Sequence, residues 1–146
     1  MSFNKRIKHR LLIISTLILL LTSFLVSASN EKSFQRIATF PVFLNSNIEN
    51  ETVAEIVAAS KNGKTLIYTD GKMEAIGFVD IENAKNPKPA GLLPVGGEPT
   101  SVAVKNKYAL VAVNTSLDFV NVSGNLVVVD IKSKNMVLLN FKWVNS

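Results

Sequence analysis

The chain has 146 residues, no cysteine and a single histidine, and its formal net charge is +5. Four of its 16 basic residues and none of its 11 acidic residues lie in the first ten positions, so the remainder carries 12 − 11 = +1, which argues against a nucleic-acid surface. His9 lies in the same basic head. The rest of the chain therefore lacks the groups for Ser-His-Asp or Cys-His catalysis and for the usual zinc sites.

Residues 1–28 have the pattern of a secretory signal peptide. A head with four basic residues precedes an uncharged apolar run over 11–28, which ends in Val26-Ser27-Ala28. We expect a helical signal segment, cleavage after Ala28, and export to the periplasm, the cell surface or the medium. The alternative is an uncleaved anchor, because a run of this length is at the short end of a membrane span. Membrane contact is expected only through this segment, if it is not cleaved.

Residues 29–52 are expected to form a linker and an edge strand. The stretch 34–43 is apolar enough for a strand, and Pro41 within it favours an edge position, where a backbone N–H is not needed. Residues 45–51 are polar and indicate a loop.

A pattern of short apolar runs then occurs twice, over 53–99 and 100–146. Each copy is expected to supply four strands, at 54–60, 65–70, 75–81 and 90–95 in the first and at 100–105, 108–114, 125–131 and 136–141 in the second. Asn62-Gly63 between two such runs is a strong hairpin signal. The runs are apolar on both faces, which favours sheets covered on both sides. The sequence thus predicts an all-β fold, a partial β-propeller with two four-stranded antiparallel blades.

The two copies differ in length between their second and third strands. Aligning Asp70 with Asn114 gives an offset of 44, and aligning Asp80 with Asp130 gives 50, so the second copy has 50 − 44 = 6 extra residues there. Insertions that collect at one end of a repeat protein often mark its binding side. A tolerated surface insertion is the alternative.

Three connections are expected at that end of the sheets, at 71–74, 96–99 and 115–124. Asp70, Glu74 and Glu98 lie in or beside them and are candidate oxygen ligands for calcium. Their spacing matches no known metal loop, and the alternative is that they are solvated turn residues.

Residues 97–104, 108–114 and 124–131 resemble the repeat of bacterial secreted β-propellers of the YVTN and LVIVD type. That repeat has glycine, proline and an apolar strand, then a strand ending in Thr-Asn or similar, then a strand ending in Val-Asp. The stretch 34–130 is similar to the N-terminal part of large exported bacterial proteins, many labelled alkaline phosphatase or esterase-like. The resemblance implies a ring of more than two blades. Residues 140–146 lack the glycine-proline start of a third copy, so we expect a truncated propeller.

We expect an exported scaffold, part of a binding or surface protein, whose loop end binds a protein or small-molecule ligand, with no catalytic machinery and no nucleic acid. The alternative implied by the resemblance is the N-terminal fragment of a calcium-dependent propeller phosphoesterase of the alkaline phosphatase or phytase kind. A third hypothesis is a complete small protein that oligomerises into a ring. We expect no cofactor, with calcium as the alternative.

Overall fold

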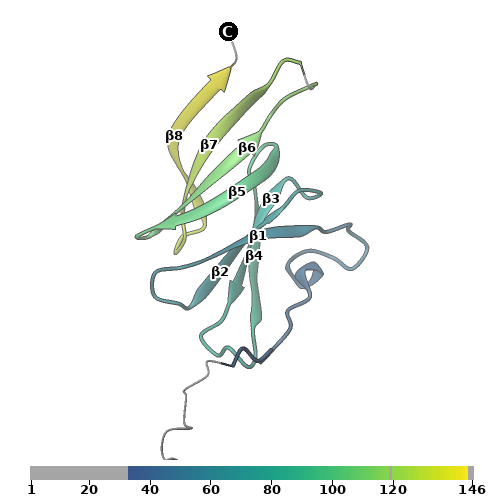
Figure 1. Ribbon diagram of the computed structural model, residues 1–146, viewed down its shortest axis with the longest axis vertical. Coiled ribbons are helices and arrows are strands. Elements are labelled where there is room, and N and C mark those ends of the chain that lie inside the picture. Colours follow the sequence, from purple (N-terminus) through teal and green to yellow (C-terminus); the bar gives the residue numbers. More distant parts are fainter. Residues whose placement is uncertain (1–32, 119, 145–146) are drawn as a thin grey trace, which may run out of the picture. The chain divides into compact units, whose positions relative to one another are not determined.

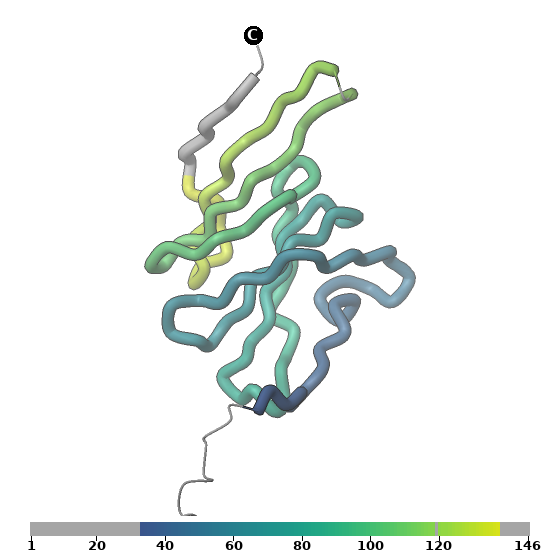
Figure 2. Tube along the Cα trace, in the orientation of Figure 1, coloured from purple at the N-terminus to yellow at the C-terminus, as the bar shows by residue number. Residues whose placement is uncertain are grey.

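A computed structural model describes residues 33–118 and 120–144 (Figures 1 and 2). The expected signal segment lies outside these residues. The chain from Arg36 onward forms one compact unit. Its described part is all-β apart from one short 3-10 helix, η1, over Val42–Asn45.

Eight strands form two four-stranded antiparallel sheets in the described part of the chain, as predicted. Sheet 1 has the order β1-β2-β3-β4 and consists of β1 (Ala54–Ala59), β2 (Thr65–Asp70), β3 (Ala75–Asp80) and β4 (Lys88–Pro94). Sheet 2 has the order β5-β6-β7-β8 and consists of β5 (Glu98–Lys105), β6 (Tyr108–Asn114), β7 (Ser123–Asp130) and β8 (Asn135–Val144). Strands β2 and β6 have the predicted bounds, and the others differ by up to three residues at an end.

The turn between β1 and β2 follows from its local chemistry. Gly63 has a φ of 69°, which an L side chain rarely adopts. The Oδ1 atom of Asn62 accepts hydrogen bonds from the Ser60 hydroxyl at 2.7 Å and from the Lys64 N–H at 3.1 Å. The Asn62-Gly63 hairpin expected from the sequence is therefore confirmed.

The two sheets share their register as well as their strand order. Thr65 pairs with Asp80 where β2 and β3 meet, and Tyr108 pairs with Asp130 where β6 and β7 meet. Just beyond these pairs, the Ile81 N–H donates to the Lys64 carbonyl at 2.9 Å. The Ile131 N–H donates in the same way to the Lys107 carbonyl at 3.0 Å.

This pairing corrects the alignment of Asp70 with Asn114. Thr65 corresponds to Tyr108, an offset of 108 − 65 = 43, while Asp80 and Asp130 keep the offset of 50. Between these positions sheet 2 therefore has 50 − 43 = 7 extra residues, one in β6, two in β7 and four in the connection between them. The one-residue difference matters because side chains alternate along a strand, so it exchanges the two faces of the sheet.

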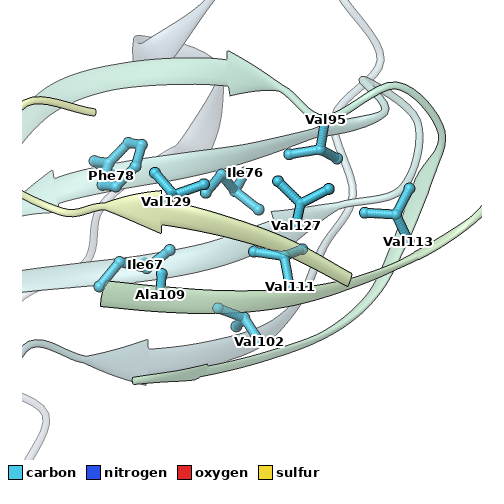
Figure 3. Close-up of a cluster of buried hydrophobic side chains, with 10 residues drawn as sticks. All are labelled: Ile67, Ile76, Phe78, Val95, Val102, Ala109, Val111, Val113, Val127 and Val129. Atoms are coloured by element: carbon cyan, nitrogen blue, oxygen red, sulfur yellow. The ribbon is translucent and has the colours of Figure 1, made fainter. Parts of the chain in front are cut away.

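The core lies between the two sheets (Figure 3). Sheet 1 contributes Ile67, Ile76 and Phe78, all with 0% exposure. The sheet 2 side consists of small β-branched and alanine side chains, namely Val102, Ala109, Val111, Val113, Val127 and Val129. Strands β1, β2 and β3 contact sheet 2 through β5. Large side chains of one sheet thus pack on a smooth face of the other.

The edge strand expected over 34–43 is not formed. Residues 33–41 have no strand pairing, and η1 begins at Val42. Pro41 has no N–H to donate to a ladder, and its carbonyl instead accepts from the Leu44 N–H at 3.1 Å, which starts the 3-10 turn. Phe40 and Val42 line a hollow over β1, β2 and β3. The segment therefore contacts sheet 1 through its side chains.

Asn45 fixes the end of this segment to sheet 1 with four hydrogen bonds. Its Nδ2 group donates to the Tyr68 hydroxyl at 3.0 Å and to the Phe78 carbonyl at 2.9 Å. Its Oδ1 atom accepts from the Ala90 and Gly91 N–H groups, both at 3.0 Å. The register between β3 and β4 shifts here, between Gly77 and Val79, so one side chain satisfies backbone groups that the ladder leaves unpaired.

Candidate functional site

The strand directions bring three connections to one end of the sheets, as predicted. These are the β2–β3 turn, the β4–β5 connection and the β6–β7 loop over 115–122. We call this the acidic end and define it as residues 51–55, 70–75, 94–98 and 114–123. It contains six acidic residues and one lysine, a formal charge of 1 − 6 = −5.

Asp70, the first predicted calcium ligand, is fully buried where β2 ends. Its Oδ1 atom accepts hydrogen bonds from the Val53 N–H at 3.0 Å and the Met73 N–H at 3.2 Å, so it organises the turn that follows. Its Oδ2 atom is buried and has no hydrogen-bond partner among the described residues.

The other predicted ligands lie on the surface of the same end. Glu74 is exposed in the β2–β3 turn with a φ of 47°, and its carbonyl accepts from the Val95 N–H at 3.0 Å. Glu98 is exposed at the start of β5, and its carboxylate lies close to Gly71. A Cβ placed on Gly71 would lie 3.7 Å from Oε1 of Glu98 and 3.8 Å from Oε2 of Glu55. Glu55, which the sequence analysis missed, therefore lies at the same place.

The acidic side chains lie at the same end of the sheets, but they do not form a recognisable metal-binding group among the described residues. Within 33–118 and 120–144, no three His, Cys, Asp or Glu side chains come together in a way that could hold a metal ion. Calcium binding by Asp70, Glu74 and Glu98 therefore remains a prediction.

The β6–β7 loop, described at 115–118 and 120–122, exposes two apolar side chains. Leu117 is 99% exposed and Val120 is 84% exposed. Between them, Oδ1 of Asp118 accepts from the Val120 and Asn121 N–H groups at 2.8 and 2.6 Å. These bonds lower the pKa of the Asp118 carboxyl below its ordinary value, and the bond from the Asn121 backbone contributes most. The carboxylate thus shapes the loop tip.

The opposite end of the sheets carries the reverse charge. We call it the basic end and define it as residues 59–65, 80–88, 105–108 and 130–135, which include the other four turns. It contains eight lysines and three acids, a formal charge of 8 − 3 = +5. The lysines are scattered along the sequence, and the sheet topology brings them together at one end.

A cleft of about 590 Å³ opens at the basic end. Three turns meet there: β1–β2, β5–β6 and β7–β8 (Figure 1). Its lining consists of Ser60, Lys61, Asn62, Thr65, Asn106, Lys107, Ile131 and Lys132. All its charged residues are lysines, so the cleft is suited to anions. Sequence reasoning missed it, and the signal that could have found it is a lysine at or beside each of these turns.

Lys107 is the lysine of this cleft whose surroundings are best defined. Its Nζ atom lies 3.4 Å from Oδ2 of Asp130 and 4.9 Å from the centroid of the Tyr108 ring. Interaction with Tyr108, and then with Asp130, raises the pKa of Lys107 above its ordinary value. The hydrogen bond from the Ser133 backbone N–H is the main cause that lowers the pKa of Asp130, and the interaction with the Lys107 ammonium lowers it further. Lys107 is therefore a firmly cationic group that remains 67% exposed.

Comparison of the chain with family models, with curated proteins and with solved structures found no match. In the described part of the chain, no helix is both long and apolar enough to cross a membrane.

Proposed function

We propose that this chain is an exported, non-catalytic binding scaffold of the β-propeller type, in which sheets 1 and 2 are two consecutive blades. The shared strand order, the shared register at Thr65 and Tyr108, and the packing of the sheets across one apolar core support this proposal. Stacking of similar sheets is how repeat architectures bury faces that one unit cannot bury alone.

The observation that carries the proposal is the correspondence between two sheet faces. The offsets of 43 and 50 place Leu110, Leu126 and Val128 at the positions of Ile67, Ile76 and Phe78. In sheet 1 these positions are fully buried against sheet 2. In sheet 2 these positions face away from sheet 1, and Leu110 and Leu126 stay partly exposed there while Val128 is buried. A further sheet of the same kind, from another copy or a longer polypeptide, fits this face.

The acidic end is the working end of the proposed scaffold. Leu117 and Val120 offer an apolar anchor on the longest connection of that end. Asp118 lies beside them, and the acidic end as a whole carries a formal charge of −5. A partner with an apolar pocket and a basic rim suits this arrangement.

Assembly of the chain purified as the cell exports it tests the proposal. Size-exclusion chromatography with light scattering is expected to show a discrete complex. Leu110→Glu is expected to dissociate it, because a charge would be buried on the face that the next sheet covers. Asn86→Glu, at an exposed turn position, adds the same charge and leaves the complex intact. A monomer of the 146-residue chain that is stable with the Leu110 face uncovered would overturn the proposal, whichever source supplies the further sheet.

Two further measurements separate the alternatives. N-terminal sequencing of the exported chain is expected to begin at Ser29 if the segment 1–28 is a cleaved signal. Calcium-dependent hydrolysis of a generic phosphate ester by the same preparation would favour the phosphoesterase hypothesis over the scaffold.

A further inference from the structure

We propose that the cleft at the basic end binds an oligophosphate group, either as an inorganic chain or as part of a nucleotide. The inference concerns the end of the sheets opposite the proposed working loops. It holds whether or not the chain is exported or assembles into a ring.

The electrostatics of the cleft select a ligand with several negative charges. Lys61, Lys107 and Lys132 come from three different turns and surround one space. The ion pairs among the described residues engage Lys64, Lys72 and Lys107, so Lys61 and Lys132 remain available to a ligand. A lysine ammonium binds phosphate as a point charge. Several lysines around one space therefore suit a ligand with adjacent phosphates better than a ligand with a single carboxylate.

The neutral lining adds hydrogen-bond donors to these charges, although the Ser60 hydroxyl is not one of them because it already donates to Asn62. Oδ1 of Asn62 is already an acceptor for Ser60 and Lys64, so the remaining capacity of this amide is its two N–H donors. Asn106 and Thr65 add a second amide and a hydroxyl to the lining. The volume of about 590 Å³ lies within the range of small-molecule sites.

The lining also favours an oligophosphate over single-stranded nucleic acid. Binding of single strands relies on aromatic side chains on which bases stack. The lining residues are Lys, Asn, Ser, Thr and Ile, and none of them is aromatic. Recognition therefore depends on the charged chain.

Titration calorimetry of the full chain with sodium tripolyphosphate at low salt tests the proposal. We expect saturable one-to-one binding that weakens as salt is added, because salt screens exposed charges. The triple variant Lys61→Gln, Lys107→Gln and Lys132→Gln is expected to lose about tenfold or more in affinity. A matched triple variant, Lys72→Gln, Lys85→Gln and Lys88→Gln, removes the same charge outside the cleft and is expected to bind like the parent chain.

Two results would overturn the proposal: no binding of tripolyphosphate at low salt, or equal weakening by the two triple variants, which would indicate attraction to net charge alone. Circular dichroism checks that each variant folds. If the cleft variant does not fold, tripolyphosphate is titrated into the parent chain, and amide shifts confined to Asn62, Asn106 and Lys132 support the site, whereas diffuse shifts contradict it. Titration with ATP identifies the source, because tighter binding of ATP indicates a nucleotide and equal binding an inorganic chain.

Discussion

Asn45 shows how one residue can take the place of a piece of backbone ladder. Its amide donates twice and accepts twice, and three of its four partners are backbone groups of β3 and β4 near the register shift. The fourth partner is the hydroxyl of Tyr68 on the neighbouring strand. Burial is the main cause that raises the pKa of this hydroxyl. The Tyr68 ring covers Gly77, where any Cβ would overlap it. A small set of side chains thus holds the segment over sheet 1.

Asn45→Ala is expected to lower the free energy of unfolding by about 2–4 kcal/mol, because it leaves several partly buried polar groups without a partner. Urea denaturation followed by circular dichroism measures this change. Asn47→Ala is the matched control, since Oδ1 of Asn47 makes only a local, exposed contact of 3.3 Å with the Glu49 N–H. Equal midpoints for the two variants would contradict the role given to Asn45.

Among the elements, the β6–β7 loop differs most between the two sheets. The β2–β3 turn occupies 71–74, whereas the corresponding connection in sheet 2 occupies 115–122. Its base is closed by the Thr115 N–H, which donates to the Ser123 carbonyl at 3.0 Å, and by contacts of the Ser116 hydroxyl with Ser123. Its tip is formed around Asp118. The loop is therefore held at both its base and its tip.

The tip is expected to lose its order in acid. The folded loop lowers the pKa of Asp118 below the ordinary value of 3.8, so the carboxylate's contribution is fully present above pH 3.8 and is lost as the pH falls through the lower folded value. Hydrogen exchange at the Val120 and Asn121 amides measures this loss. Asp118→Ala is expected to exchange rapidly at neutral pH as well. Slow exchange in that variant would show that the carboxylate does not order the tip.

The sequence predicted most elements because their signals are local. Short Val- and Ile-rich runs and turn dipeptides such as Asn62-Gly63 are read within a few residues, and the strands formed close to the expected bounds. The stretch 34–43 has a similar apolar content, but Pro41 and the four bonds of Asn45 direct the chain into a 3-10 turn. Apolar content alone could not distinguish these outcomes.

The candidate sites were less accessible to sequence reasoning, because pairing across strands determines them. The order of the strands suffices to place Asp70, Glu74 and Glu98 at one end. That Glu55 approaches Gly71 depends on how β1 lies beside β2, and the basic cleft depends on how sheet 2 packs on sheet 1. The one-residue error in aligning the two copies had the same cause, since register is invisible until the partner strand is known.

At the scale of the whole molecule, the two sheets depend on one core. Phe78 is fully buried between them, with side chains of both sheets in the same cluster. Sheet 1 buries Phe78, Ile67 and Ile76 there, and sheet 2 supplies the smooth valine face that receives them. Each of these inner faces is buried by the other sheet, so we expect the two sheets to fold as one cooperative unit.

Phe78→Ala is expected to cost about 3–5 kcal/mol, the usual range for removing a buried aromatic side chain. That is a large part of the ~5–15 kcal/mol that stabilises a typical domain. Native-state hydrogen exchange is expected to accelerate in β6 and β7 as well as in β2 and β3. Val57→Ala is the control, because Val57 is 61% exposed. Acceleration confined to sheet 1 would show that the sheets unfold independently.

The opposite charges of the two ends, −5 and +5 by formal count, also give the molecule a direction. Charges of opposite sign separated along the strands form an electric dipole, whose field extends beyond the range of any contact when the ionic strength is low. Near a negatively charged surface such a molecule turns its basic turns inward and its acidic loops outward before it touches anything. The same strand order that gathers the lysines would therefore orient the protein as it approaches the surface.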